Sequence, residues 1–465
     1  MINDDSFDVV VVGGGPGGYS AAIRASQLGG RVALIENDTV GGVCTNRGCI
    51  PTKFLLGSAE LLESIRKAKN FGITVSDPQV DLPAMIAAKE GVVKRLVKGI
   101  EFLLSKNRVK LYSGFGSISD PGSVRVAGND GLSIILRAKN TILATGSESL
   151  RPPIEGMDGE GILTSDEVLK VDKIPSEMII LGGGPEGVEF ASIFQAFGTK
   201  IHLIDMLPRI LPKEDSEIGT TLQRIFERSG VSVHCDSRVV KVGDVSGKKI
   251  VEIAQEGARL KLEGEVVLLC MGRKPNITRL GLEIVGLKTN RDKIQVNSRM
   301  ETNVPSIYAV GDCASTHLLA YTAAEEGIVA AQNALGSDSQ VDYSVLPRCI
   351  FCKPEVGAVG ITEDELRNTG MKYVVGKFSF RANGRAISAA KSDGFVKILS
   401  GEDDKKILGV HILGPYATEI VHQATLAMKL GATLDDLAGL LYGHPTFSES
   451  LKEAAYAGLG RPLNS

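Results

Sequence analysis

The stretch GGVCTNRGCIPTK, residues 41–53, holds two thiols, Cys44 and Cys49, with four residues between them. Such a pair can be a structural disulfide, part of a metal site, two inert buried groups or a redox couple. A zinc site needs four ligands, and this segment supplies no others. A structural disulfide is rare in a reducing compartment, and the flanking glycines and proline are not a core pattern. These arguments favour a reactive pair.

Helix geometry sets a condition on that pair. Five residues of a regular helix turn by about 500°, which leaves the two side chains about 140° apart. They can bridge only if the turn is distorted, and Gly48 between them and Pro51 just after would permit a distortion at a helix start. A helix N-terminus also lowers the pKa of a thiol. A reversible redox pair is therefore physically reasonable here.

A second candidate group lies near the C-terminus, in HPTFSE, residues 444–449. A single histidine is most often a surface residue or a satisfied core residue. Here Pro445 disfavours helix at His444, and Glu449 could accept a hydrogen bond from one ring nitrogen and leave the other as a base. The other five histidines show no comparable arrangement.

An internal repeat predicts the elements that position these groups. Residues 11–36 align without gaps with residues 180–205. Each copy has an apolar strand, a G-x-G-x-x-G turn, an Ala-rich helix, a second strand and a terminal acid. The residues are Gly13, Gly15, Gly18 and Glu36 in the first copy, and Gly182, Gly184, Gly187 and Asp205 in the second. The glycines let backbone approach a pyrophosphate at a helix N-terminus, and the acid accepts hydrogen bonds from ribose hydroxyls.

The acid of the second copy also bears on the choice of nucleotide. Asp205 would repel a 2′-phosphate, and the residues that follow it bring no basic cluster. Arg209 alone is a weak argument for NADP. The sequence therefore favours NAD.

Composition excludes some partners and favours a compartment. The net charge is −3, with no run of five like charges, which argues against nucleic acid or a membrane surface. No apolar run reaches the roughly 18 residues of a membrane span. Seven cysteines, an odd number, favour a reducing cytoplasm.

The redox segment resembles the disulfide motif of the class I pyridine nucleotide-disulfide oxidoreductases, and HPTFSE is similar to the catalytic motif of the dihydrolipoamide dehydrogenases within that family. The resemblance runs from Val9 to about Ala457. It implies an α/β fold with two Rossmann-like dinucleotide-binding domains and a C-terminal α+β dimerisation domain. The expected ranges are 1–148 and 272–342 for the two parts of the FAD-binding domain, 149–271 for the NAD-binding domain and 343–465 for the dimerisation domain.

The resemblance also implies roles for individual residues. FAD would bind the first glycine turn and NAD the second. Cys49 would lie against the flavin, Cys44 would exchange with substrate, and Lys53 would pair with Glu189 beside the flavin. His444 with Glu449 would face the disulfide of the partner subunit in a homodimer. The further cofactor contacts that it implies are Gly116, Thr145, Gly146, Ser147, Gly272, Asp312, Leu318, Leu319, Ala320 and Tyr321, and no metal site is expected.

The chain departs from the family pattern at several positions. The family usually has Thr at Val43, a small apolar residue at Arg47, Ser at Thr52, and His at both Tyr321 and Tyr442. The charge of Arg47 could stabilise a thiolate or point to solvent, and the second interpretation is favoured. A further pair, Cys349 and Cys352, is interpreted as buried thiols on a strand.

The implied activity is oxidation of protein-bound dihydrolipoamide to lipoamide with reduction of NAD+, through the Cys44–Cys49 disulfide and FAD. The implied partner is a lipoyl-bearing protein or a 2-oxoacid dehydrogenase complex. One alternative is another NAD(P)H-dependent disulfide or metal-ion reductase. The glutathione-type reductases usually carry arginines after the second nucleotide strand, and the mercuric reductases carry a C-terminal cysteine pair; this sequence shows neither. A second alternative is a flavoprotein subunit whose main role is docking into an acyltransferase complex.

Overall fold

The computed structural model describes residues 6–464. The N-terminal domain is built on the strand β1 (Ser6–Val12), whose valines are buried because parallel strands and helices cover it. In the sheet, β2 and β5 flank β1, β18 lies beyond β5, β3 lies beyond β2, and β4 runs antiparallel between β3 and β5. Their bounds are β2 (Val32–Glu36), β3 (Lys110–Asp120), β4 (Ser123–Gly128), β5 (Ser133–Leu143) and β18 (Ile307–Ala309).

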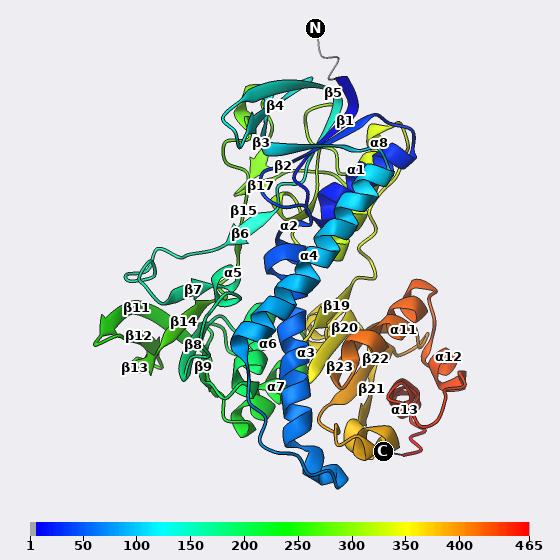
Figure 1. Ribbon diagram of the computed structural model, residues 1–465. Coiled ribbons are helices and arrows are strands. Elements are labelled where there is room, and N and C mark those ends of the chain that lie inside the picture. Colours follow the sequence, from blue (N-terminus) through cyan, green and yellow to red (C-terminus); the bar gives the residue numbers. More distant parts are fainter. Residues whose placement is uncertain (1–5, 465) are drawn as a thin grey trace.

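Helices cover the sheet of this domain and extend from it. Helices α1 (Pro16–Gln27) and α8 (Ala320–Ala334) pack on each other beside the sheet. The long helices α3 (Cys49–Arg66) and α4 (Leu82–Lys106) run away from it, toward the other two domains (Figure 1). Leu55 and Leu56 of α3 belong to a core cluster shared with the second dinucleotide domain, so α3 ties the domains together.

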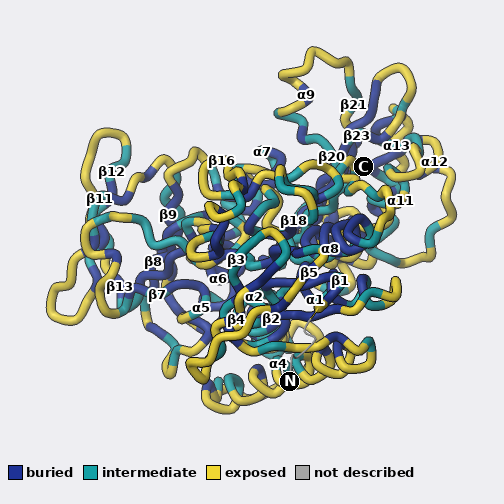
Figure 2. Tube along the Cα trace, turned by 90° about the horizontal axis from the view of Figure 1, so that it is seen from above, coloured by how far each residue is buried: buried dark blue, intermediate teal, exposed yellow. Residues whose placement is uncertain are grey.

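The second domain repeats the parallel plan. Its five strands follow the order β10-β9-β8-β14-β7, and the antiparallel strands β11 to β13 form a separate sheet with exposed loops (Figure 2). The parallel strands are β7 (Ile162–Thr164), β8 (Glu177–Leu181), β9 (Lys200–Ile204), β10 (Ser232–His234) and β14 (Val266–Leu269). The separate sheet holds β11 (Ser237–Val245), β12 (Lys248–Gln255) and β13 (Ala258–Gly264), and the helices are α5 (Ser165–Val168), α6 (Pro185–Ala196) and α7 (Ser216–Arg228).

The C-terminal domain is an antiparallel sheet in the order β19-β20-β23-β22-β21 with helices on it (Figure 1). The strands are β19 (Pro347–Ile350), β20 (Glu355–Gly360), β21 (Tyr373–Ser379), β22 (Phe395–Gly401) and β23 (Ile407–Gly414). The helices are α9 (Glu363–Thr369), α10 (Gly384–Ser388), α11 (Ala417–Lys429), α12 (Leu434–Gly439) and α13 (Glu449–Gly458).

A short ribbon joins the two dinucleotide domains. It pairs β6 (Ser147–Ser149) with β15 (Arg273–Pro275), where the chain enters and leaves the second domain. Another small ribbon, β16 (Thr289–Asn290) with β17 (Lys293–Ile294), lies in the returning segment. The predicted fold class is confirmed, whereas the numbered domain boundaries stay a prediction.

Candidate active site

The helix that carries the two cysteines is interrupted between them. Helix α2 (Gly42–Arg47) holds Cys44, and Cys49 is the first residue of α3. Gly48 separates the helices with φ −140° and ψ −108°, and a Cβ there would lie 3.0 Å from the carbonyl oxygen of Val43. From the sequence, a bridge between the thiols required a distorted turn, which Gly48 and Pro51 would permit at a helix start; the structure has the break at Gly48 and Cys49 at the N-terminus of α3.

The two thiols differ in acidity. A hydrogen bond from the Cys44 thiol, together with the charge of Lys53, lowers the pKa of Cys49 to about 7 although burial opposes this. The same hydrogen bond, together with burial, raises the pKa of Cys44. In the reduced pair the negative charge therefore sits on Cys49 and the proton stays on Cys44.

Lys53 and Glu189 meet beside this pair from two different domains. Lys53 Nζ lies 2.7 Å from Glu189 Oε2. Glu189 is buried on α6, and its Oε1 accepts a hydrogen bond from the backbone N–H of Phe351 at 2.9 Å. Lys53 Nζ also lies 4.5 Å from the centre of the Phe351 ring. The ion pair therefore joins α3, α6 and the segment after β19.

The two glycine turns have the same geometry. Gly13 and Gly182 have φ of +104° and +110°, values that favour glycine. A Cβ on Gly187 would come within 1.8 Å of the carbonyl oxygen of Gly182, so glycine is required for the close approach of helix and strand. Gly15 and Gly184 are the residues directly before α1 and α6, and neither helix has a side-chain cap.

These turns fit the phosphates of a dinucleotide. A Cβ on Gly184 would meet no atom within 4 Å, so the N-terminus of α6 is open to a ligand. Glu36 Oε2 accepts from the N–H of Gly14 at 2.7 Å, and Asp205 Oδ2 accepts from the N–H of Gly183 at 2.6 Å. Each predicted ribose acid is thus held against its own glycine turn, as the repeat implied.

The predicted contacts around Asp312 form one cluster. Ser147 Oγ donates to Asp312 Oδ2 at 2.5 Å, and the Nε–H of Arg273 donates to Ser147 Oγ at 2.7 Å. The N–H of Gly311 donates to Glu326, a fully buried carboxylate on α8. Arg273 and Glu326 were not predicted from the sequence. The position of Arg273 directly after Gly272, at the crossing between the domains, could have indicated it.

The other predicted cofactor contacts are more dispersed. Thr145 Oγ1 donates to the carbonyl oxygen of Asn276 at 2.7 Å. Gly146 and Gly272 have φ of +69° and +105° on either side of the β6–β15 ribbon. Gly116 packs inside the first domain, where a Cβ would meet Val12 at 2.8 Å.

The stretch Leu318–Tyr321 leads into α8. Leu319 is the residue before the helix and Ala320 is its first residue. The Tyr321 hydroxyl donates to the carbonyl oxygen of Pro347. This contact ties the start of α8 to the C-terminal domain.

The predicted histidine–glutamate pair is formed within one chain. His444 Nδ1 lies 2.8 Å from Glu449 Oε1, and Glu449 Oε2 accepts from the N–H of Thr446 at 2.7 Å. The His444 side chain is 79% exposed. The pair lies between α12 and α13, well apart from α2 (Figure 1). The structure therefore does not bring His444 to the cysteines of its own chain.

The charge of Arg47 is committed to ion pairs. Its Nη1 lies 2.5 Å from Asp38 Oδ2, and its Nε lies 3.1 Å from Asp166 Oδ2 on α5 of the second domain. The side chain is 37% exposed and both of its contacts are with carboxylates, so its charge is not free in solvent. Arg47 instead links the redox helix to the nucleotide domain.

The remaining departures have local environments of their own. The Tyr442 hydroxyl is buried with no hydrogen-bond partner within residues 6–464, and burial raises its pKa to about 12. Cys349 and Cys352 pack in different hydrophobic clusters. Cys352 is fully buried and Cys349 is partly buried, which suits the interpretation of these two as unreactive thiols.

Comparison with known proteins identifies the family. Residues 7–334 match the model of the pyridine nucleotide-disulphide oxidoreductases, and residues 346–455 match the dimerisation domain of the same family. The chain belongs to this family. The predicted cofactors, FAD and NAD, are confirmed by this membership, whereas their assignment to the first and the second glycine turn stays a prediction.

The relatives share nearly the whole chain. It is 40% identical to mitochondrial dihydrolipoyl dehydrogenase 1 of Arabidopsis thaliana, over 99% of this chain and 92% of the relative. It is 40% identical to the dihydrolipoyl dehydrogenase of Thermus scotoductus, over 97% of each protein. The crystal structure of LpdA from Mycobacterium tuberculosis superposes with a TM-score of 0.89 at 28% identity, covering 96% of this chain and 98% of LpdA. Within residues 6–464, no helix has the length and hydropathy to cross a membrane.

Proposed function

We propose that this chain is a dihydrolipoyl dehydrogenase, which oxidises protein-bound dihydrolipoamide to lipoamide and reduces NAD+. The observation that carries the proposal is the Cys44–Cys49 pair across the α2–α3 break, with its acidic thiol beside the Lys53–Glu189 ion pair. The dihydrolipoyl dehydrogenases similar to this chain along its length support the choice of substrate. Bound FAD would take the two electrons from the reduced pair and deliver them to NAD+ as hydride.

The difference in thiol acidity assigns the order of exchange. A substrate thiolate attacks Cys44 Sγ, the Cys44–Cys49 bond breaks, and Cys49 leaves as thiolate. A thiol of lower pKa leaves faster, so attack at Cys44 is favoured. The second substrate thiolate then attacks the substrate sulfur of the mixed disulfide, and Cys44 departs and takes a proton. The substrate dithiol is oxidised and the protein disulfide is reduced.

We further propose that the base comes from the partner subunit. His444, held by Glu449, is exposed on the C-terminal domain and lies apart from Cys44 of its own chain. The match of residues 346–455 to a dimerisation domain supports an arrangement in which each site joins the cysteines of one subunit and the His444 of the other. His444 then accepts a proton from the substrate dithiol.

Mixed dimers test the shared site. Cys44→Ser and His444→Gln chains are each expected to be inactive, because each homodimer lacks one part of both sites. Random reassembly makes half of the dimers mixed, and each mixed dimer has one intact site, so the mixture recovers about a quarter of the wild-type activity. The absence of any recovery in a mixture with verified mixed dimers would contradict the shared site.

Substrate comparison tests the activity itself. Steady-state rates with lipoamide, glutathione disulfide and coenzyme A disulfide separate a dihydrolipoyl dehydrogenase from the other reductases of the family. A preference for either of the other disulfides would reject the proposal. The partner that we propose is a lipoyl-bearing protein of a 2-oxoacid dehydrogenase complex, and the odd number of cysteines supports a cytoplasmic location.

A further inference from the structure

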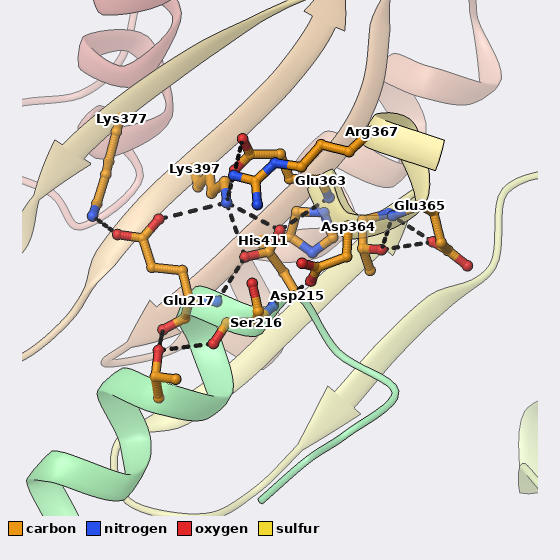
Figure 3. A network of polar contacts seen from close by, with 12 residues as sticks. Asp215, Ser216, Glu217, Glu363, Asp364, Glu365, Arg367, Lys377, Lys397 and His411 are labelled. Carbon is orange, nitrogen blue, oxygen red and sulfur yellow. Dashed lines mark hydrogen bonds and ion pairs between the residues drawn. The ribbon is translucent and has the colours of Figure 1, made fainter. Parts of the chain in front are cut away.

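A cluster of buried charges joins the second dinucleotide domain to the C-terminal domain (Figure 3). Lys397 on β22 is 1% exposed and Asp215 is 0% exposed. Lys397 Nζ lies 2.9 Å from Asp215 Oδ1 and 2.6 Å from Glu363 Oε2. Asp215 caps the N-terminus of α7, and Glu363 begins α9, so Lys397 lies between two helix N-termini from different domains.

A second charged contact joins the same two domains next to the first. The Nε and Nη2 of Arg348, on β19, donate to the two carboxylate oxygens of Glu214 at 2.9 and 3.0 Å. Glu214 is 6% exposed. A bidentate contact between a guanidinium and a carboxylate fixes orientation as well as distance. Neighbouring acids at positions 214 and 215 are thus both held by cations of the C-terminal domain.

These two acids end the loop that begins at the predicted NAD ribose acid. Asp205 starts the loop, and the N–H of Leu211, in its middle, donates to the carbonyl oxygen of Gly183 at 2.8 Å. Gly183 in turn donates its N–H to Asp205 at 2.6 Å. The N–H of Glu214 donates to the carbonyl oxygen of Leu211 at 2.9 Å. Asp205, the glycine turn and the loop therefore form one hydrogen-bonded unit. Lys397 and Arg348 hold the end of this loop at Asp215 and Glu214.

In the first domain the corresponding loop makes the same hydrogen bond to its glycine turn but leads into a different element. There the N–H of Gly41 donates to the carbonyl oxygen of Gly14 at 2.8 Å, and the loop continues into the redox helix α2. The second copy has no redox pair, and its loop runs instead to Glu214 and Asp215. A buried ion pair usually stabilises a fold less than an apolar pair of similar size. The Lys397–Asp215 pair is therefore better explained by a need for a fixed position than by a gain in stability.

We infer that Lys397 and Arg348 are positioning residues for the NAD-binding turn: they act through Asp215 and Glu214 to hold the loop, Gly183 and Asp205 in the geometry that binds the nucleotide. NAD affinity is thereby set in part by the C-terminal domain. The inference rests on the proposed function only for the assignment of NAD to the second turn.

Titration calorimetry of the FAD-loaded dimer with NAD+ tests this inference. Lys397→Met raises the Kd for NAD+ by about tenfold, a size typical of coupling between two sites. Arg348→Gln, at a more exposed side chain, raises it in the same direction. The KM for NAD+ rises with the Kd, whereas the KM for dihydrolipoamide and the FAD content stay as in the wild type.

Two further proteins separate positioning from stability. Lys397→Met combined with Asp215→Asn removes both charges of the buried pair, and Glu363 keeps Arg367, so the Tm recovers in part while the Kd stays raised. The recovery is partial because an Asn amide has one acceptor oxygen, whereas Asp215 accepts from the N–H groups of both Glu217 and Glu363. Arg367→Gln is the matched control: Arg367 lies 2.7 Å from Glu363 in the same cluster, no hydrogen bond or ion pair within residues 6–464 joins it to the loop, and the Kd of this variant is unchanged. If Lys397→Met does not fold, the double variant and Arg348→Gln carry the test.

A Kd for NAD+ within twofold of the wild type in both the double variant and Arg348→Gln would overturn the inference. The charge cluster would then contribute to stability alone. A raised Kd that falls back when the Tm recovers would overturn it as well. Calorimetry needs no turnover, so a protein that binds NAD+ normally but does not oxidise dihydrolipoamide would refute the proposed function alone.

Discussion

Removal of the Cys44 thiol is expected to raise the pKa of Cys49. The hydrogen bond from Cys44 contributes most to lowering the pKa of Cys49 from its ordinary value to about 7, ahead of the charge of Lys53, while burial acts against both. A drop of two units corresponds to about 2.7 kcal/mol in favour of the thiolate. Cys44→Ala leaves only Lys53 and the helix N-terminus to oppose burial.

The size of the effect follows from the titration curve. At pH 7 a thiol of pKa about 7 is about half ionised, whereas a rise of one unit leaves about a tenth as thiolate. We therefore expect alkylation of Cys49 in the reduced Cys44→Ala protein to be about fivefold slower at pH 7 and to have its midpoint at least about one unit higher, because the thiolate is the reactive form. Cys44→Ser keeps a hydroxyl donor and should lie between the two.

The assay is iodoacetamide labelling across pH, read by mass spectrometry. Trypsin cleaves after Arg47, which separates Cys44 from Cys49, so each thiol is followed on its own peptide. Lys53→Met provides the comparison, with a smaller upward shift. An unchanged midpoint in Cys44→Ala, or a larger shift in Lys53→Met than in Cys44→Ala, would refute this account of the acidity of Cys49.

Three further predictions concern other parts of the chain. His444→Gln or Glu449→Gln should lower kcat by about 10²- to 10⁴-fold, the range for a lost general base, with FAD content unchanged; a kcat near the wild-type value would exclude the pair as the base. Arg47→Gln should lower the Tm, since Asp166 loses its cation, but leave the Cys49 labelling midpoint in place; a shifted midpoint would show that Arg47 tunes the thiols. Burial lowers the pKa of His411 to about 4. Between pH 6.5 and 4 the unfolded chain therefore binds a proton that the folded chain does not, and the free energy of unfolding decreases as the pH is lowered. The share of His411 is about 2 kcal/mol between pH 7 and pH 5, and His411→Gln should remove it in denaturant titrations; equal losses in both proteins would contradict the assignment.

Local patterns were enough for the dinucleotide folds. The repeat of glycines, strands and acids predicted two similar turns, and Gly13 and Gly182 adopt the same left-handed conformation. The distortion at Gly48 was also readable, because two thiols at helical spacing cannot meet without one. Each of these features depends on residues that are close in the chain.

The partners of charged groups could not be read from local patterns. Arg47 was expected at the surface, yet it pairs with Asp166 of another domain. Only the family resemblance suggested the Lys53–Glu189 pair, which joins residues far apart in the sequence. Nothing in the sequence marks Lys397, because a lysine in a strand looks like a solvent-facing residue until its neighbours are known.

The sequence alone thus determined the two nucleotide turns, because short-range sterics and hydrogen bonds impose them, and its motifs indicated the family and a place where the helix between Cys44 and Cys49 could break. The tertiary structure decided which charges meet, since a buried ion is stable only beside the partner that domain packing brings to it. The contacts of Lys397 with Asp215 and of Arg348 with Glu214 exist only after three separate segments have folded against one another.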